Sequence, residues 1–168
     1  MSEMKNRWIA MYVENQVGVL AKVSGLFSGK CYNLQSLTVG TTEDETVSRL
    51  TISVSSYDIT FELIKKQLNR MVEVIKVIDL SDVPIHMKEI MFAKISKLDA
   101  EGKAEIFRIA DIFHVNVCDL GVDSLILECK LKEKRNNELI EVLKAQFKHI
   151  SIVRGGAVAI EAISKESR

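Results

Sequence analysis

The chain has 168 residues, of which 47% are apolar and 27% are charged, and its 23 basic and 23 acidic residues cancel. That length suits one large domain or two small ones with real apolar cores. Neither half carries the excess of positive charge that binds nucleic acid, no apolar stretch is long enough to span a membrane, and the N-terminus lacks a signal-peptide layout. Three cysteines without a C-x-x-C pair argue against a disulfide framework. We therefore expect a globular, cytoplasmic protein.

The hydrophobic pattern of the first half switches between the periods of strands and helices. Residues 8–13 predict a buried strand, and apolar residues then recur at helical spacing from Val17 to Gly29, where the helix should end. Residues 32–39 predict a second strand. Residues 49–54 alternate apolar and polar side chains, which predicts a third strand with one buried face and one wet face.

A helix and a fourth strand complete this half of the chain. Asp58 is a candidate N-cap for a helix with an apolar stripe, and residues 72–80 predict a strand. The predicted order is therefore strand, helix, strand, strand, helix, strand.

The same order appears again about 82 residues further along. Residues 81–87 hold the only proline and predict a linker. Apolar patterns after the linker predict strands near residues 90–95, 115–120, 125–131 and 150–153, with helices around residues 106–113 and 139–147. The sequence thus predicts an α+β protein of two tandem ferredoxin-like βαββαβ sandwiches, in residues 1–80 and 88–168. The sheet face without helices would be covered by a second copy, so we expect a dimer.

Motifs for catalysis are missing from the sequence. His86, His114 and His149 are scattered, and neither a nucleophile elbow nor a phosphate-binding glycine loop occurs. The spacing of His114 and Cys118 does not favour a metal site, because the segment between them has the pattern of a strand. We expect no catalytic residue and no metal in this chain. An RNA-recognition module has this topology, but the aromatic run and basic groove that it needs are missing.

The loop between the first strand and the first helix suits a small ligand. Gly18 at a helix entrance would let backbone N–H groups approach a carboxylate, which the helix dipole also favours. Asn15 could donate to, or accept from, the polar end of an amino acid. In an equally good interpretation, Asn15 caps the helix and Gly18 relieves a tight turn. The corresponding loop of the second half, residues 96–103, lacks this arrangement.

Four segments together resemble the small regulatory subunit of acetolactate synthase, also called acetohydroxyacid synthase. The segments are Glu14-Asn15-Gln16-Val17-Gly18-Val19-Leu20, Gly25-Leu26-Phe27-Ser28, Tyr32-Asn33-Leu34-Gln35-Ser36-Leu37-Thr38-Val39-Gly40 and Ser48-Arg49-Leu50-Thr51-Ile52. The first loop alone occurs in many ACT domains, which bind amino acids. The resemblance covers nearly the whole chain and is densest in residues 10–80.

The resemblance implies an N-terminal ACT domain, a homodimer and a separate catalytic subunit that holds thiamine diphosphate, magnesium and FAD. The small subunit would activate this partner and confer feedback inhibition by valine or a related branched-chain amino acid. The effector would bind between two ACT domains, with one chain supplying Asn15, Val17, Gly18, Val19 and Leu20 and the other supplying Asn33 and Leu34. Without this role Asn33 is an ordinary polar residue at a strand edge. The alternative function is a free-standing ACT-type sensor that regulates another enzyme or a transcription factor.

The sequence departs from the family pattern at three places. Cys31 stands where the family commonly has glycine, Gln35 stands where it often has glutamate, and residues 154–157 only approximate its usual R-[ST]-G. The second half diverges most, so the resemblance supports the binding of an effector better than the details of coupling to the partner.

Overall fold

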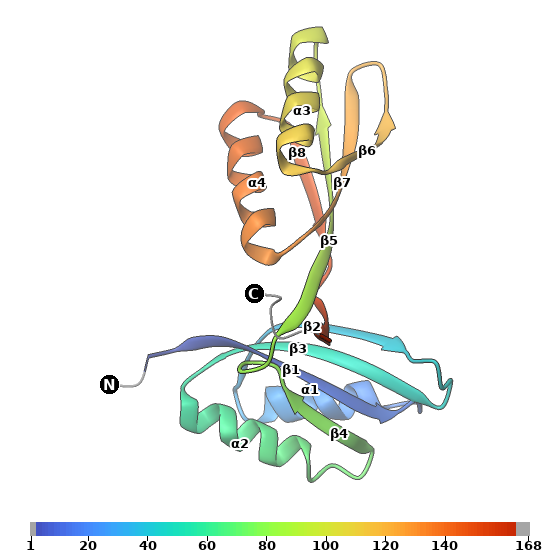
Figure 1. Cartoon of the computed structure of the whole chain (residues 1–168), viewed down its shortest axis with the longest axis vertical. Coiled ribbons are helices and arrows are strands. Elements are labelled where there is room, and N and C mark those ends of the chain that lie inside the picture. The colour runs from blue at the N-terminus through green and yellow to red at the C-terminus, as the bar shows by residue number, and fades with distance from the viewer. Residues whose placement is uncertain (1–2, 164–168) are drawn as a thin grey trace. The chain divides into compact units, whose positions relative to one another are not determined.

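The computed structural model describes residues 3–163, which divide into two units. The first unit contains residues 3–87 and 157–163, and the second contains residues 88–156. In each unit four antiparallel strands carry two helices on one face (Figure 1). The predicted α+β class with two tandem ferredoxin-like sandwiches is confirmed.

The first unit begins with the six elements that the sequence predicts. They are β1 (Lys5–Glu14), α1 (Val19–Gly29), β2 (Asn33–Thr41), β3 (Val47–Ser56), α2 (Asp58–Leu68) and β4 (Val74–Asp79). The strands lie in the order β2-β3-β1-β4, so β1 and β3 are central and β2 is an edge strand. Alternate residues of the central strands pack against both helices, and the core consists of Ile9, Met11, Val13, Val19, Val23, Phe27, Leu50, Ile52, Val54, Phe61, Ile64 and Leu68.

Helix α1 ends in a Schellman motif that explains the unusual Cys31. The N–H of Tyr32 donates to Phe27 C=O at 3.0 Å, and the N–H of Cys31 donates to Ser28 C=O at 3.2 Å. Cys31 has a φ of 54°, in the left-handed region where glycine is favoured. The rings of Phe27 and Tyr32 meet edge to face with centroids 6.2 Å apart. A glycine at this position would adopt the same conformation without strain.

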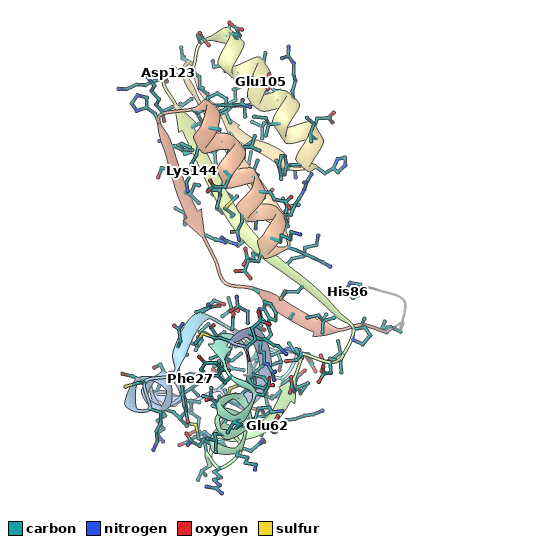
Figure 2. The ribbon with its side chains drawn as sticks, turned by 90° about the vertical axis from the view of Figure 1, so that its left-hand side faces the viewer. Phe27, Glu62, His86, Glu105, Asp123 and Lys144 are labelled. Carbon is teal, nitrogen blue, oxygen red and sulfur yellow. The ribbon has the colours of Figure 1, made fainter. Side chains whose placement is uncertain are left out.

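The second unit repeats the arrangement. Its elements are β5 (Ile85–Ser96), whose first three residues belong to the first unit, α3 (Ala100–Phe113), β6 (Asn116–Leu120), β7 (Ser124–Leu131), α4 (Glu133–Gln146) and β8 (Ile150–Arg154). The strand order is β6-β7-β5-β8. Figure 2 shows α3 and α4, marked by Glu105 and Lys144, side by side over the sheet. Asp99 caps α3 by accepting a hydrogen bond from Gly102 N–H at 2.8 Å.

A ninth strand, β9 (Val158–Glu161), was not predicted, and it lies in the first unit. It pairs with β5, and Ala162 N–H donates to Pro84 C=O at 2.8 Å. Ala159 is only 2% exposed and packs in a small cluster with Ala10 and Leu80. Residues 85–87 are the start of a strand and not a linker, and residues 157–163 do not belong to the second unit, so the observed division differs from the predicted one at both places.

This C-terminal segment lies on the face of the first sheet that has no helices. Thr51 and Ser53, on that face of β3, are each only 5% exposed. The prediction that β3 has one wet face is therefore wrong, because β3 is flanked by strands on both sides and its second face is covered. The chain itself covers part of the face for which we expected a second copy.

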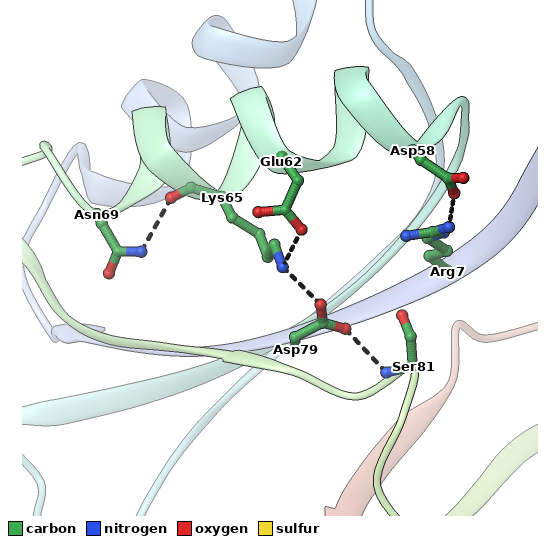
Figure 3. Close-up of polar contacts among 7 residues, drawn as sticks. All are labelled: Arg7, Asp58, Glu62, Lys65, Asn69, Asp79 and Ser81. Atoms are coloured by element: carbon green, nitrogen blue, oxygen red, sulfur yellow. Dashed lines mark hydrogen bonds and ion pairs between the residues drawn. The ribbon is translucent and has the colours of Figure 1, made fainter.

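Polar contacts fix α2 to the sheet (Figure 3). The predicted N-cap, Asp58, is wrong: Tyr57 occupies the cap position, and Asp58 is the first helical residue, whose carboxylate pairs with Arg7 of β1. Lys65 Nζ lies 2.7 Å from an Asp79 carboxylate oxygen on β4 and 2.6 Å from Glu62. Burial alone would raise the pKa of Asp79, but hydrogen bonds from Lys65 and Ser81 outweigh it and lower the pKa below its ordinary value.

We expect Asp79→Asn to cost about 1 kcal/mol of stability at pH 7, because it removes a charge paired with Lys65. With a lowered folded-state pKa, the carboxylate contributes stability above its unfolded-state pKa and loses it as the pH falls through the folded-state pKa. The difference between parent and variant should therefore shrink below about pH 4. Urea unfolding followed by Trp8 fluorescence reports on this unit. Glu62→Gln is the control, and it should cost less stability because its carboxylate is more exposed. If Asp79→Asn lowered stability equally at pH 3 and pH 7, the ion pair of Asp79 with Lys65 would not be the source of the effect.

Cys31→Gly should stabilise the first unit by about 0.5–1 kcal/mol, because glycine adopts the left-handed conformation without the penalty of a side chain. Lys30→Gly is the matched control, since Lys30 has a φ of −107° and gains nothing from glycine. Chemical denaturation of both variants measures the difference. Equal or lower stability of Cys31→Gly would show that its backbone conformation is not strained.

Candidate functional site

The entrance to α1 has the backbone geometry that a bound carboxylate needs. Gly18 occupies the N-cap with a φ of 89°, and no side chain caps the helix. The first helical hydrogen bond runs from Lys22 N–H to Gly18 C=O at 3.0 Å. The N–H groups of Leu20 and Ala21 therefore precede the internal bonding of α1, and within residues 3–163 neither has an acceptor. These donors and the helix dipole favour an anion at this position.

Asn15 fastens the loop and does not cap the helix. Its Nδ2 donates to Glu45 C=O at 2.8 Å, and its Oδ1 accepts from Ser48 Oγ at 3.0 Å. The backbone N–H of Asn15 also donates to Thr46 C=O at 2.7 Å. The interpretation of Asn15 as a helix cap is wrong. A carboxamide has two N–H donors, so Asn15 keeps one for a ligand while its other bonds hold the loop to the β2–β3 turn.

Of the predicted apolar site residues at the α1 entrance, two are exposed and one is buried. Val17 is fully exposed and Leu20 is 42% exposed, so both offer apolar surface to a ligand. Val19 is only 4% exposed and packs in the core of the first unit. Val19 could therefore contribute to the predicted site through its backbone only.

Asn33 and Leu34 lie at the other end of the sheet. Asn33 pairs with Ser55 at one end of β3, whereas Glu14, which precedes the loop, pairs with Val47 at the opposite end. Eight residues of strand separate these positions, which amounts to roughly 25 Å. Asn33 is exposed and Leu34 is half-buried against the core. The two groups of predicted site residues do not meet within one chain.

The cysteines divide into two exposed residues and one buried residue. Cys31 and Cys118 are exposed, and Cys129 lies in the core of the second unit. Burial raises the pKa of the Cys129 thiol to about 11, so this thiol is unreactive. Within residues 3–163, no three His, Cys, Asp or Glu side chains gather as a metal site would require.

Sequence reasoning did not single out Arg49, which lies on the helix-free face of β3. Its guanidinium carbon lies 5.0 Å from the centroid of the Tyr12 ring. Its Nη1 donates to the Tyr12 hydroxyl, and its Nη2 donates to Ala159 C=O at 2.9 Å and to Glu161 at 3.0 Å. Tyr12 is its register partner on β1. The sequence offered one sign of this contact, because an arginine at a polar position of a central strand needs partners for its charge.

Comparison with known proteins identifies the family. A family model described as an "AHAS small subunit-like ACT domain" matches residues 9–76, and one described as "Small subunit of acetolactate synthase" matches residues 88–163. The chain belongs to the acetolactate synthase small-subunit family.

Relatives in this family extend over almost the whole chain. The acetolactate synthase small subunit of Aquifex aeolicus is 36% identical over 158 residues, which cover 94% of this chain and 82% of the relative. That of Haemophilus influenzae is 34% identical over 154 residues, covering 92% and 94% respectively. The crystal structure of the acetolactate synthase small subunit from Thermotoga maritima is similar with a TM-score of 0.84 and 32% identity, covering 95% of this chain and 99% of that one. Among the helices of residues 3–163, none has the length and apolar character needed to cross a bilayer.

Gly18→Ala should destabilise the first unit by about 1 kcal/mol, because a φ of 89° is strained for any residue with a side chain. An added Cβ at Gly18 meets no atom within 4 Å, so the effect comes from the backbone alone. Gly25→Ala is the matched control: its Cβ also meets open space, but within a helix it should stabilise by about 0.5–1 kcal/mol. Equal effects in urea unfolding would exclude conformational strain at Gly18.

Proposed function

We propose that this chain is the regulatory subunit of an acetolactate synthase in branched-chain amino acid biosynthesis. It activates a separate catalytic subunit and makes that subunit sensitive to valine or a related branched-chain amino acid. The chain performs no chemistry itself. Thiamine diphosphate, magnesium and FAD belong to the catalytic partner. Family membership supports this role, and the geometry of the α1 entrance is the observation that carries the effector site.

The opposite placement of the two groups of site residues supports a site shared by two chains. Strand β2 is an edge of the first sheet and can pair with β2 of a second copy. Two-fold symmetry makes such a pair antiparallel, so the end of one sheet that carries Asn15 would lie beside the partner's end that carries Asn33. A homodimer would thus contain two equivalent sites, each with residues from both chains.

The chemistry of these residues suits a branched-chain amino acid. Its carboxylate would accept from the free N–H groups of Leu20 and Ala21, and its remaining polar contacts would come from Asn15 and Asn33. A charged group left unpaired inside an interface is costly, so several donors and acceptors are needed. The side chains of Val17, Leu20 and Leu34 would enclose the aliphatic group, whose full burial stabilises binding by roughly 1.5–3 kcal/mol.

A site between two chains also provides a means of regulation. Binding there favours the arrangement of the two chains for which the effector has the higher affinity, and that arrangement acts on the catalytic partner. A free-standing amino-acid sensor would share the site but would not form a complex with a thiamine-dependent enzyme. Co-purification of the tagged chain with a thiamine-dependent catalytic subunit distinguishes the two functions.

We expect Asn15→Ala to abolish valine inhibition of the reconstituted holoenzyme and to leave activation of the catalytic subunit in place. Asn69→Ala is a matched control, because Asn69 also uses its carboxamide to bond a backbone carbonyl, at the end of α2. Acetolactate production is measured against valine concentration for each variant. Unchanged valine sensitivity in Asn15→Ala would reject the effector site at the α1 entrance.

A further inference from the structure

Residues 157–162 form a short segment that we call the C-terminal strap. Its strand β9 pairs with β5, and its carbonyl and carboxylate groups accept three hydrogen bonds from side chains of the first sheet. Thr38 Oγ1 donates to Ala157 C=O, and Arg49 donates to both Ala159 C=O and Glu161. Ala162 N–H donates to Pro84 C=O at 2.8 Å.

The apolar contribution to this attachment is small. The strap buries the side chains of Ala157 and Ala159, whereas Val158 and Ile160 are 65% and 59% exposed. Two methyl groups provide far less burial than a core strand does. A cavity of about 320 Å³ lies beside the strap and is lined partly by Val39, Val158 and Ile160. The side chains of Val158 and Ile160 are therefore not packed against other residues on that side. Segments held in this way open locally at a much lower free energy than the core.

Arg49 makes two of the three side-chain hydrogen bonds that join the strap to the first sheet. Its side chain is 16% exposed and that of Glu161 is 38% exposed, so the ion pair is partly protected from water. Burial alone would raise the pKa of Glu161, but backbone hydrogen bonding and Arg49 lower it below its ordinary value. Apart from its backbone pairing with β5, the strap is thus held by polar side chains that can separate without exposing a large apolar surface.

The residues that hold the strap lie on β2, which carries Asn33, and on β3, which carries the hydrogen-bond partner of Asn15. Ser48, which bonds Asn15, directly precedes Arg49 on β3, and their side chains point to opposite faces of the sheet. Thr38 lies on β2, the strand that begins with Asn33. A displacement of either strand end by a ligand would therefore move an anchor of the strap.

We propose that the C-terminal strap is a releasable element, that Arg49 fastens it, and that an effector at the α1 entrance strengthens its attachment. Residue 157 directly follows the second unit in sequence. The strap supplies the two-state element that coupling between sites requires. The fastening role of Arg49 stands by itself, whereas the response to an effector rests on the proposed function.

The fastening role is tested in the full chain with Arg49→Met and Glu161→Gln. Glu105→Gln is the matched control, because Glu105 also pairs with an arginine and is 37% exposed, but lies in the second unit. Trp8, the single tryptophan, packs against the cluster that contains Ala159, so acrylamide quenching of its fluorescence reports release of the strap. Amide hydrogen exchange of residues 157–162 reports the same opening directly.

We expect exchange in the strap to rise about fivefold in Glu161→Gln and at least about tenfold in Arg49→Met, with stronger quenching of Trp8. Exchange in the core strands should stay unchanged. Glu105→Gln should leave both readouts as in the parent. If hydrogen exchange in the strap were the same in Glu161→Gln as in Glu105→Gln, Arg49 would not fasten the strap. This test remains available if Arg49→Met fails to fold.

The response to an effector is tested by adding valine to the parent and to Asn15→Ala. We expect valine to slow strap exchange in the parent at least about threefold, and to have no effect in Asn15→Ala. Valine that binds by calorimetry but leaves strap exchange unchanged would overturn the coupling and leave the proposed function intact. Absence of valine binding to the parent would instead reject the effector function, together with the coupling that rests on it.

Discussion

The burial of β3 on both faces is the constraint on which the first unit depends. Leu50, Ile52 and Val54 pack under the two helices, while Thr51 and Ser53 are buried on the opposite face. A strand in this position needs a cover on its second side, and the chain provides part of it with its own C-terminal residues. The same strand begins beside the loop that precedes α1, so the core, the candidate site and the C-terminal strap share one structural element.

Much of the fold could be predicted because it depends on local pattern. The period of apolar residues predicted twelve helices and strands in the correct order, and Gly18 was singled out at a helix entrance where the backbone is left-handed. The wet face of β3 was wrongly predicted because serine and threonine are taken as solvated until their neighbours are known. Strand β9 has only a weak hydrophobic pattern, because its buried residue Ala159 is small and occurs in loops as readily as in strands.

The parts of the site that could not be predicted depend on long-range partners. The carboxamide of Asn15 bonds groups 30 and 33 residues away, so no local pattern separates a helix cap from a loop fastener. Asp58 fits the sequence rule for a cap, yet its carboxylate pairs with Arg7, 51 residues away. Arg154 belongs to the segment that departs from the family pattern, and it binds the buried Glu89 with its Nε 2.8 Å from the carboxylate. The departure of residues 154–157 from the family pattern therefore does not remove the ion pair between Arg154 and Glu89.

A regulatory site built from the opposite ends of two identical sheets has a direct consequence for variants. Asn15→Ala and Asn33→Ala each damage both sites of a homodimer. A mixed dimer of the two variants combines the damage in one site and leaves the other intact. Calorimetry with valine on each variant alone and on their re-equilibrated mixture therefore tests the account most directly. We predict no binding by either variant and recovery in the mixture of about a quarter of the parent's sites. A mixture that binds no valine, although the parent does, would contradict a site shared between chains.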